Sequence, residues 1–140
     1  GISNCYSLDF FKELYSQAKH KPKVLQNRFY SDSNFDTELR QFCREQGIQY
    51  QSFWTLGANQ RGIRHPEWQE AAAKAGLTPE VFMFTFLMSM GYITPLSGTR
   101  SQLHMAQDVA IMERMQHGEI FFPNEADLRK FANLLGMPDL

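Results

Sequence analysis

The stretch YITPLSGTRSQLHMAQD, residues Tyr92–Asp108, contains a short strand, a loop of small residues and the start of a helix. Its first residues are apolar or aromatic, and Pro95 ends them, as is typical of a buried strand. Ser97–Arg100 then brings two hydroxyls and a guanidinium to the beginning of a helix near Arg100. A phosphate docked there can accept bonds from unpaired helix N–H groups. An ordinary N-cap by Thr99 or Ser101 explains the same residues, so both interpretations stay open.

The composition is that of an ordinary globular domain. The chain has 140 residues, of which 43% are hydrophobic and 14% aromatic, enough for one domain with a core. A net charge of −1 provides no electrostatic basis for binding nucleic acid. The two cysteines make no disulfide framework, and the longest apolar run, Val81–Met90, is too short to cross a bilayer. We therefore expect a cytoplasmic protein with neither a nucleic-acid nor a membrane partner. The four histidines lack metal-ligand spacing, so no metal site is expected.

Strand and helix signals alternate along the chain. The first four residues, GISN, resemble the end of a strand already under way, so we expect the chain to be part of something longer. The other expected strands lie at Val24–Tyr30, Ile48–Leu56 and the segment from Tyr92. The expected helices begin or run as follows: from Ser7, Phe35–Gln46, from His65 to Ala75, from Thr78 to Gly91, from near Arg100, and Asn124–Leu135. We expect Gly57–Arg64 to be an irregular loop.

This alternation predicts an α/β fold with a parallel sheet built from (β/α) units. The loops that follow parallel strands gather at one edge of the sheet. Polar residues follow all four expected strands, so we predict one cleft lined by all four strand ends. Four strands are too few to close a barrel, which needs about eight and roughly 250 residues.

Five motifs, in order and spacing, resemble the aldo-keto reductases, a family of NAD(P)H-dependent (β/α)8 barrels. They span nearly the whole chain: GISN at residues 1–4, VLQN at 24–27, ELRQFC followed by GI within 38–48, FWTLG at 53–57, and ITPLSGTR at 93–100 with Gln107-Asp108 beyond it. The resemblance implies that residues 1–140 form the C-terminal half of a TIM-type (β/α)8 barrel. That half comprises the fifth to eighth strands, their helices and a C-terminal helix.

The resemblance also implies a cofactor site for NADP(H), with NAD(H) as the second candidate. Amide and hydroxyl groups of the first two motifs would hold the nicotinamide carboxamide, and Phe53 would stack on its ring. Arg100 favours NADPH over NADH through the 2′-phosphate. The full implied set is Ser3, Asn4, Gln26, Phe53, Trp54, Thr55, Leu56, Gly57, Gly98, Thr99, Arg100, His104, Gln107 and Asp108.

Three positions depart from the family pattern. Asp108 stands where the family has Asn, and a carboxylate cannot donate to the adenine. Trp54 and Thr55 replace Ser and Pro, so the loop beside the pyrophosphate is expected to differ in shape. We expect no functional role for the cysteines. Cys43 lies on the apolar stripe of its helix, and nothing near Cys5 marks it as reactive.

The family's catalytic Asp, Tyr, Lys and His belong to its first four strands, which these residues do not contain. None of the five tyrosines falls at the proton donor's position, so we expect no catalytic residue here and no activity from this chain alone. Two interpretations follow. The chain is the second half of a reductase whose first half supplies the site for a small carbonyl substrate. Alternatively, it is a non-catalytic half-barrel that binds a nucleotide or a protein, with a partner or a second copy covering its open edges.

Overall fold

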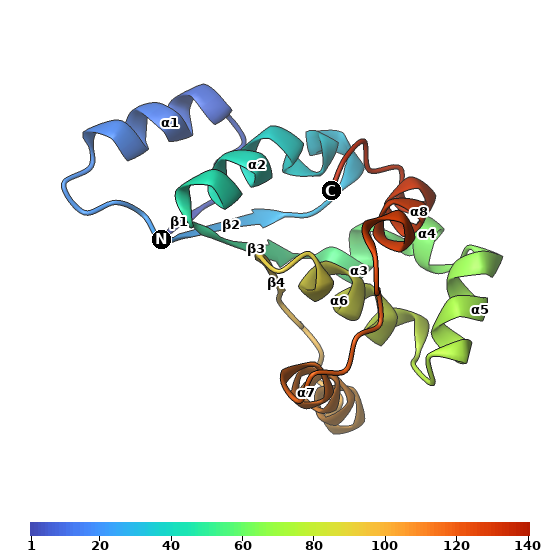
Figure 1. Ribbon diagram of the computed structural model, residues 1–140. Helices are drawn as coiled ribbons and strands as arrows, with labels where there is room; N and C mark the ends of the chain where they lie inside the picture. The colour runs from blue at the N-terminus through green and yellow to red at the C-terminus, as the bar shows by residue number, and fades with distance from the viewer.

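A computed structural model describes all residues, 1–140, and contains one sheet of four parallel strands in the order β1-β2-β3-β4 (Figure 1). The strands are β1 (Ile2–Ser3), β2 (Val24–Arg28), β3 (Gln49–Phe53) and β4 (Ile93–Pro95). The predicted α/β fold with a parallel sheet is therefore confirmed. Both outer strands, β1 and β4, pair on one side only, so the sheet stays open.

Helices connect the strands and follow the last one. They are α1 (Leu8–Gln17), the 3₁₀ segment η1 (Ser31–Asp36), α2 (Thr37–Gln46), α3 (Thr55–Ala58), α4 (Gln60–Ile63), α5 (Pro66–Lys74), α6 (Pro79–Ser89), α7 (Gln102–Gln116) and α8 (Glu125–Leu135). In Figure 1, α1 and α2 run along the same side of the sheet, and α7 stands apart from them. No helix combines the length and the apolar composition that a bilayer crossing requires.

Most helix boundaries follow the capping residues of the sequence. Ser7 and Thr78 accept hydrogen bonds from N–H groups of the first turns of α1 and α6. Pro79 occupies the first position of α6, where its missing N–H costs nothing. Gly47 ends α2 with a left-handed backbone (φ 65°), which glycine adopts without strain. These predicted ends are confirmed.

Two expectations about local structure were wrong. The segment Gly57–Arg64 is not irregular, because α3 and α4 occupy most of it. Each is four residues long, too short for a periodic apolar pattern to reveal it. Phe35 does not open α2 but lies in η1 with a left-handed backbone (φ 52°), as do its neighbours Asn34 and Asp36. The turn there inserts the Phe35 ring into the core, where it is 1% exposed.

The two faces of the sheet differ in chemistry. On one face a register row of Leu25, Tyr50 and Ile93 is fully buried and belongs to the core. On the other face the next row, Gln26 and Gln51, is polar, and Gln26 Nε2 donates to Gln51 Oε1 at 2.8 Å. Strand residues alternate between faces, so the helices cover one face and leave a polar face free.

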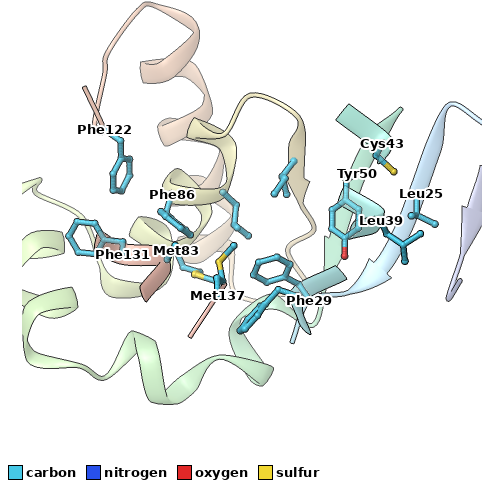
Figure 2. Packing of buried hydrophobic residues seen from close by; sticks show 14 of the residues in the cluster. Leu25, Phe29, Leu39, Cys43, Tyr50, Met83, Phe86, Phe122, Phe131 and Met137 are labelled. Atoms are coloured by element: carbon cyan, nitrogen blue, oxygen red, sulfur yellow. The ribbon is translucent and has the colours of Figure 1, made fainter. Parts of the chain in front are cut away.

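The core joins the sheet to the C-terminal helices (Figure 2). Trp68 of α5 is its largest side chain, wholly buried, with edge-to-face contacts to three phenylalanines at centroid distances of 5.3–5.7 Å. Those rings are Phe82, Phe86 and Phe131. The predicted burial of α6 is confirmed, since every residue from Val81 to Leu87 is buried.

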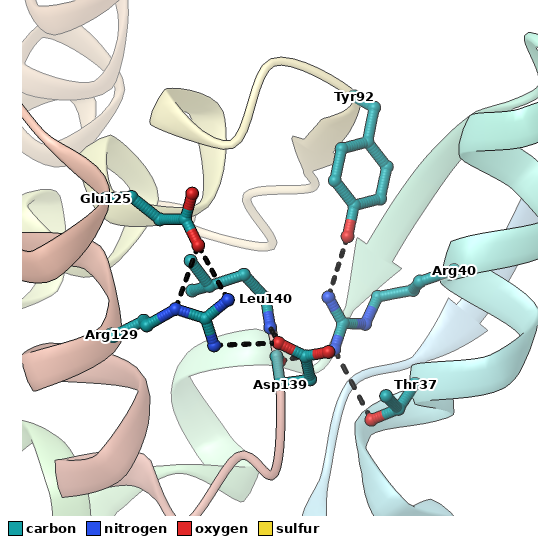
Figure 3. A network of polar contacts seen from close by, with 7 residues as sticks. All are labelled: Thr37, Arg40, Tyr92, Glu125, Arg129, Asp139 and Leu140. Carbon is teal, nitrogen blue, oxygen red and sulfur yellow. Dashed lines mark hydrogen bonds and ion pairs between the residues drawn. The ribbon is translucent and has the colours of Figure 1, made fainter.

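Arg40 is wholly buried and links distant segments (Figure 3). Its Nε donates to the carbonyl of Phe35 at 2.7 Å, and its Nη1 donates to the Tyr92 hydroxyl at 2.8 Å. Its Nη2 donates to the carbonyl of Asp139 at 3.1 Å. The polar end of a buried arginine is thereby satisfied without a carboxylate, and the C-terminal segment is attached to α2.

Candidate functional site

A cleft of about 740 Å³ opens at the carboxyl ends of β2, β3 and β4. This volume lies within the range of small-molecule and cofactor pockets. The residues after β3 form one wall, and Leu96–Thr99 and α7 form another. The start of α6, including Glu80, completes the lining.

Ten of the fourteen residues that the family resemblance implies line this cleft. They are Phe53, Trp54, Thr55, Leu56, Gly57, Gly98, Thr99, His104, Gln107 and Asp108. They come from segments about 40 residues apart in the sequence and meet only because β3 and β4 are neighbours. The sheet order thus assembles the last two motifs, at residues 53–57 and 93–108, into one site.

The other four implied residues lie outside the cleft lining. Ser3 ends β1 and Asn4 follows it. Because β2 separates β1 from β3, the predicted cleft lined by all four strand ends is lined by three. Gln26 bonds to Gln51 on the polar face. Arg100 is exposed, just ahead of α7.

The turn after β3 is held by buried polar side chains. Thr55 Oγ1 donates to the Ser52 carbonyl at 3.2 Å, and Asn59 Nδ2 donates to the carbonyls of Phe29 (2.9 Å) and Thr55 (2.8 Å). Thr55 is only 1% exposed. Its hydroxyl therefore fixes the cleft wall. Where the family pattern has a proline, whose ring would restrict the backbone, this turn is held by the hydrogen bonds of the Thr55 hydroxyl.

Trp54 shapes the middle of the cleft. Its backbone is left-handed (φ 55°), a conformation that costs a bulky residue energy and is frequent at functional sites. Its indole is about half exposed and lies against Gly57, where a Cβ atom would come within 2.7 Å of Trp54 Nε1. Gly57 is therefore needed for this ring position.

Short polar contacts organise the wall formed by α7. Ser97 Oγ donates to Asp108 Oδ2 at 2.6 Å, and Thr99 Oγ1 lies 3.4 Å from His104 Nδ1. Ser101, and not Thr99, is the N-cap of α7, because its Oγ accepts from the His104 N–H. Asp108, the departure from Asn, is thus paired with a hydroxyl of the neighbouring loop.

Sequence reasoning missed the cleft residue Arg28. It follows Gln26 by two positions in β2, so strand alternation puts both side chains on the polar face, a signal that was available. Glu80 was also missed, since the start of α6 gives no sign of facing the strand ends. No group of three or more His, Cys, Asp or Glu side chains is arranged to hold a metal ion.

Several solved structures share the fold. An aldo-keto reductase of the silkworm Bombyx mori, AKR2E5, superposes with a TM-score of 0.75 at 16% identity, over 96% of this chain and 40% of that one. The thermostable aldo-keto reductase Tm1743 gives 0.73 at 15% identity, covering 96% and 47%. An aldo/keto reductase from Brucella melitensis gives 0.65 at 19%, also covering 96% and 47%.

These likenesses define the class of fold. The chain spans less than half the length of the reductases it matches, and its four parallel strands with their helices correspond to a half-barrel. The half-barrel expected from the sequence is confirmed, and the matching structures are aldo-keto reductases, as its motifs indicated. No family model and no curated protein sequence matches the chain.

Proposed function

We propose that residues 1–140 are the C-terminal half of an NADP(H)-dependent reductase of the aldo-keto reductase type, contributing most of its cofactor site. One observation carries the proposal: ten residues that the motifs assign to the cofactor line a single cleft at the strand ends. Two proteins with the same fold, AKR2E5 and a variant of Gox0644, have been solved as complexes with NADPH.

The cleft fits a nicotinamide dinucleotide in size and chemistry. It offers a ring face at Phe53, a glycine at Gly57 and hydroxyls at Ser97 and Thr99. At Gly98 a Cβ would meet no protein atom within 4 Å, so the backbone there is open to a ligand. The bound dinucleotide would supply hydride to a carbonyl carbon. The protein's part is to orient the dinucleotide and exclude water.

The acid that protonates the reduced carbonyl, and the carbonyl substrate's pocket, are assigned to an N-terminal half. Reduction of aldehydes and ketones to alcohols is therefore proposed for the full-length protein, and residues 1–140 alone are proposed to be inactive. Both cysteines are free thiols, which supports a reducing cytoplasm.

A nucleotide titration of the full-length protein tests the proposal. We expect saturable binding of NADPH by calorimetry, and Arg100→Ala should weaken NADPH about tenfold while leaving NADH nearly unchanged. Arg64→Ala, an exposed arginine outside the cleft lining, is the control. Equal losses for both nucleotides would overturn the 2′-phosphate role of Arg100, and no binding of either would overturn the cofactor site.

The alternative is a non-catalytic half-barrel completed by a partner or a second copy. It is favoured by one observation, an apolar surface on α7 where Met105, Val109 and Met112 are 46–54% exposed. These residues share one face at helical spacing, and next to them β4 has an unpaired edge. Light scattering and a reductase assay together discriminate the two. Under the alternative, light scattering shows a defined dimer or complex of residues 1–140, and the assay finds no reductase activity in the full-length protein.

A further inference from the structure

Arg28 is a charged residue of the cleft to which the motifs assign no role. It is the last residue of β2, pairs in register with Phe53 of β3, and its side chain lines the cleft. Phe53 is the proposed platform for the nicotinamide ring. Arg28 therefore lies beside the proposed dinucleotide site, at the carboxyl end of the neighbouring strand.

Aromatic side chains hold the guanidinium in place. Arg28 Cζ lies 4.4 Å from the ring centroid of Trp54 and 5.4 Å from that of Tyr30. The Arg28 backbone N–H donates to the Tyr6 hydroxyl at 3.1 Å, and the Tyr6 ring packs edge-on against Tyr30. A guanidinium stacked on a ring loses little further freedom when its N–H groups bind a ligand.

No carboxylate of the protein pairs with this cation. None of the five ion pairs includes Arg28, and its guanidinium donates no hydrogen bond. Its Nε is buried without an acceptor, the one such side-chain atom in the chain. Of the two carboxylates in the cleft lining, Asp108 is already bonded to Ser97, and Glu80 forms no ion pair. A buried, unpaired donor next to a cleft calls for an acceptor from outside.

We infer that Arg28 binds the diphosphate of the dinucleotide, an inference that rests on the proposed function. Its planar fork of N–H groups suits two oxygens of a phosphate. The position agrees with this part of the ligand: Arg28 stacks on Trp54, which lies in the chain between the proposed ring platform Phe53 and Gly57. The 2′-phosphate is assigned to Thr99 and Arg100, which follow a different strand.

Replacing Arg28 tests the inference in the full-length protein. Arg28→Met keeps the length of the stem and removes the fork and the charge. It should weaken NADP⁺ about 10- to 100-fold by calorimetry. Arg28→Lys should fall between wild type and Arg28→Met, because it retains charge without the fork. Adenosine 2′-monophosphate, which has no diphosphate, should bind wild type and Arg28→Met equally.

Arg61→Met, which removes the same charge from an exposed position of α4, should leave NADP⁺ affinity unchanged. Unchanged NADP⁺ affinity in Arg28→Met would overturn the inference alone. So would an effect confined to the KM of carboxylate-bearing substrates, which would assign Arg28 to the substrate. Equal losses for NADP⁺ and adenosine 2′-monophosphate would mean general damage to the cleft and would also overturn it. Absence of dinucleotide binding in wild type would overturn the proposed function as well.

Discussion

Arg40 Nη2 donates a hydrogen bond to the carbonyl of Asp139, which is 99 residues further along the chain. The same guanidinium reaches the Phe35 carbonyl and the Tyr92 hydroxyl, so η1, the residue that precedes β4 and the C-terminal segment meet at one side chain. A surface ion pair between Arg129 and Asp139, at 3.0 Å, adds a second attachment of that segment. The arginine matters more than the surface ion pair, because its side chain is wholly buried and its bond to the Phe35 carbonyl is shielded from water.

Arg40→Met should lower the free energy of unfolding by about 3 kcal/mol, since it leaves the buried Phe35 carbonyl without its donor and removes the bonds to Tyr92 and Asp139, while preserving packing volume. Urea denaturation of the full-length protein measures this. Arg44→Met, on the exposed side of the same helix, should change stability by less than about 0.5 kcal/mol. A similarly small effect of Arg40→Met would show that the network contributes little.

Asp36 should make stability depend on pH. Burial raises the pKa of its carboxyl, against the lowering effect of hydrogen bonds from Asn27 (2.7 Å) and Tyr50 (2.9 Å) and of the Arg40 charge. Between the ordinary value of 3.8 and the raised native value, the folded state binds more protons than the unfolded state. The contribution of Asp36 is therefore complete below that window and is lost as the pH rises through the native pKa.

Asp36→Asn has no such proton, so the stability of wild type relative to Asp36→Asn should decline with rising pH and then level off. Urea unfolding at a series of pH values from about 3 to about 8 gives the comparison. Asp32→Asn, at an exposed position of η1, serves as the control. Parallel pH profiles of wild type and Asp36→Asn would contradict the prediction.

Cys43 should be inert in the folded protein. Burial raises the pKa of its thiol to about 12, with the nearby Asp36 charge contributing. At about pH 8 we expect maleimide labelling of Cys43, isolated in a Cys5→Ser background, to be on the order of 100-fold slower than in urea. Mass spectrometry follows the reaction. Labelling of folded and unfolded protein at the same rate would show that the helix opens readily.

Gly62→Ala should loosen the contact between α4 and α8. An added Cβ would overlap Leu135 Cδ2, so the end of the Leu135 side chain must move, while the Leu135 Cα at 3.4 Å stays in ordinary contact. We expect a loss of about 1–3 kcal/mol in the free energy of unfolding. Gly98→Ala, whose Cβ would meet nothing within 4 Å, should cost nothing measurable in stability. Equal stability of the two variants would mean that the Leu135 side chain shifts without cost.

The parts of the fold that the sequence predicted correctly are those with local signals. Thr78-Pro79 begins α6 and Gly47 ends α2 because capping is decided by a few neighbouring residues. The turn at Trp54 was missed, since an aromatic residue with a left-handed backbone has no sequence signal, and the short helices after it have no period. Ten of the residues that line the cleft were predicted from the order and spacing of the family motifs.

The position of Ser3 shows the limit of such reasoning. The carboxyl ends of parallel strands lie along the same side of a sheet. Local sequence, however, does not say how far the end of the first strand lies from the end of the third. The distance depends on sheet order and on how strongly the sheet curves, which are properties of the whole fold.

The unlike faces of the sheet have a practical consequence. The uncovered face carries Gln26 and Gln51, which water solvates readily, whereas the apolar side chains on α7 are the ones that water disfavours. Four of the eight large apolar side chains that are exposed lie on this one helix, and none belongs to a strand of the open sheet. Exchanging Met105, Val109 and Met112 for lysine or glutamate offers a route to a dispersed half-barrel for spectroscopy, since none of the three lines the cleft at the strand ends.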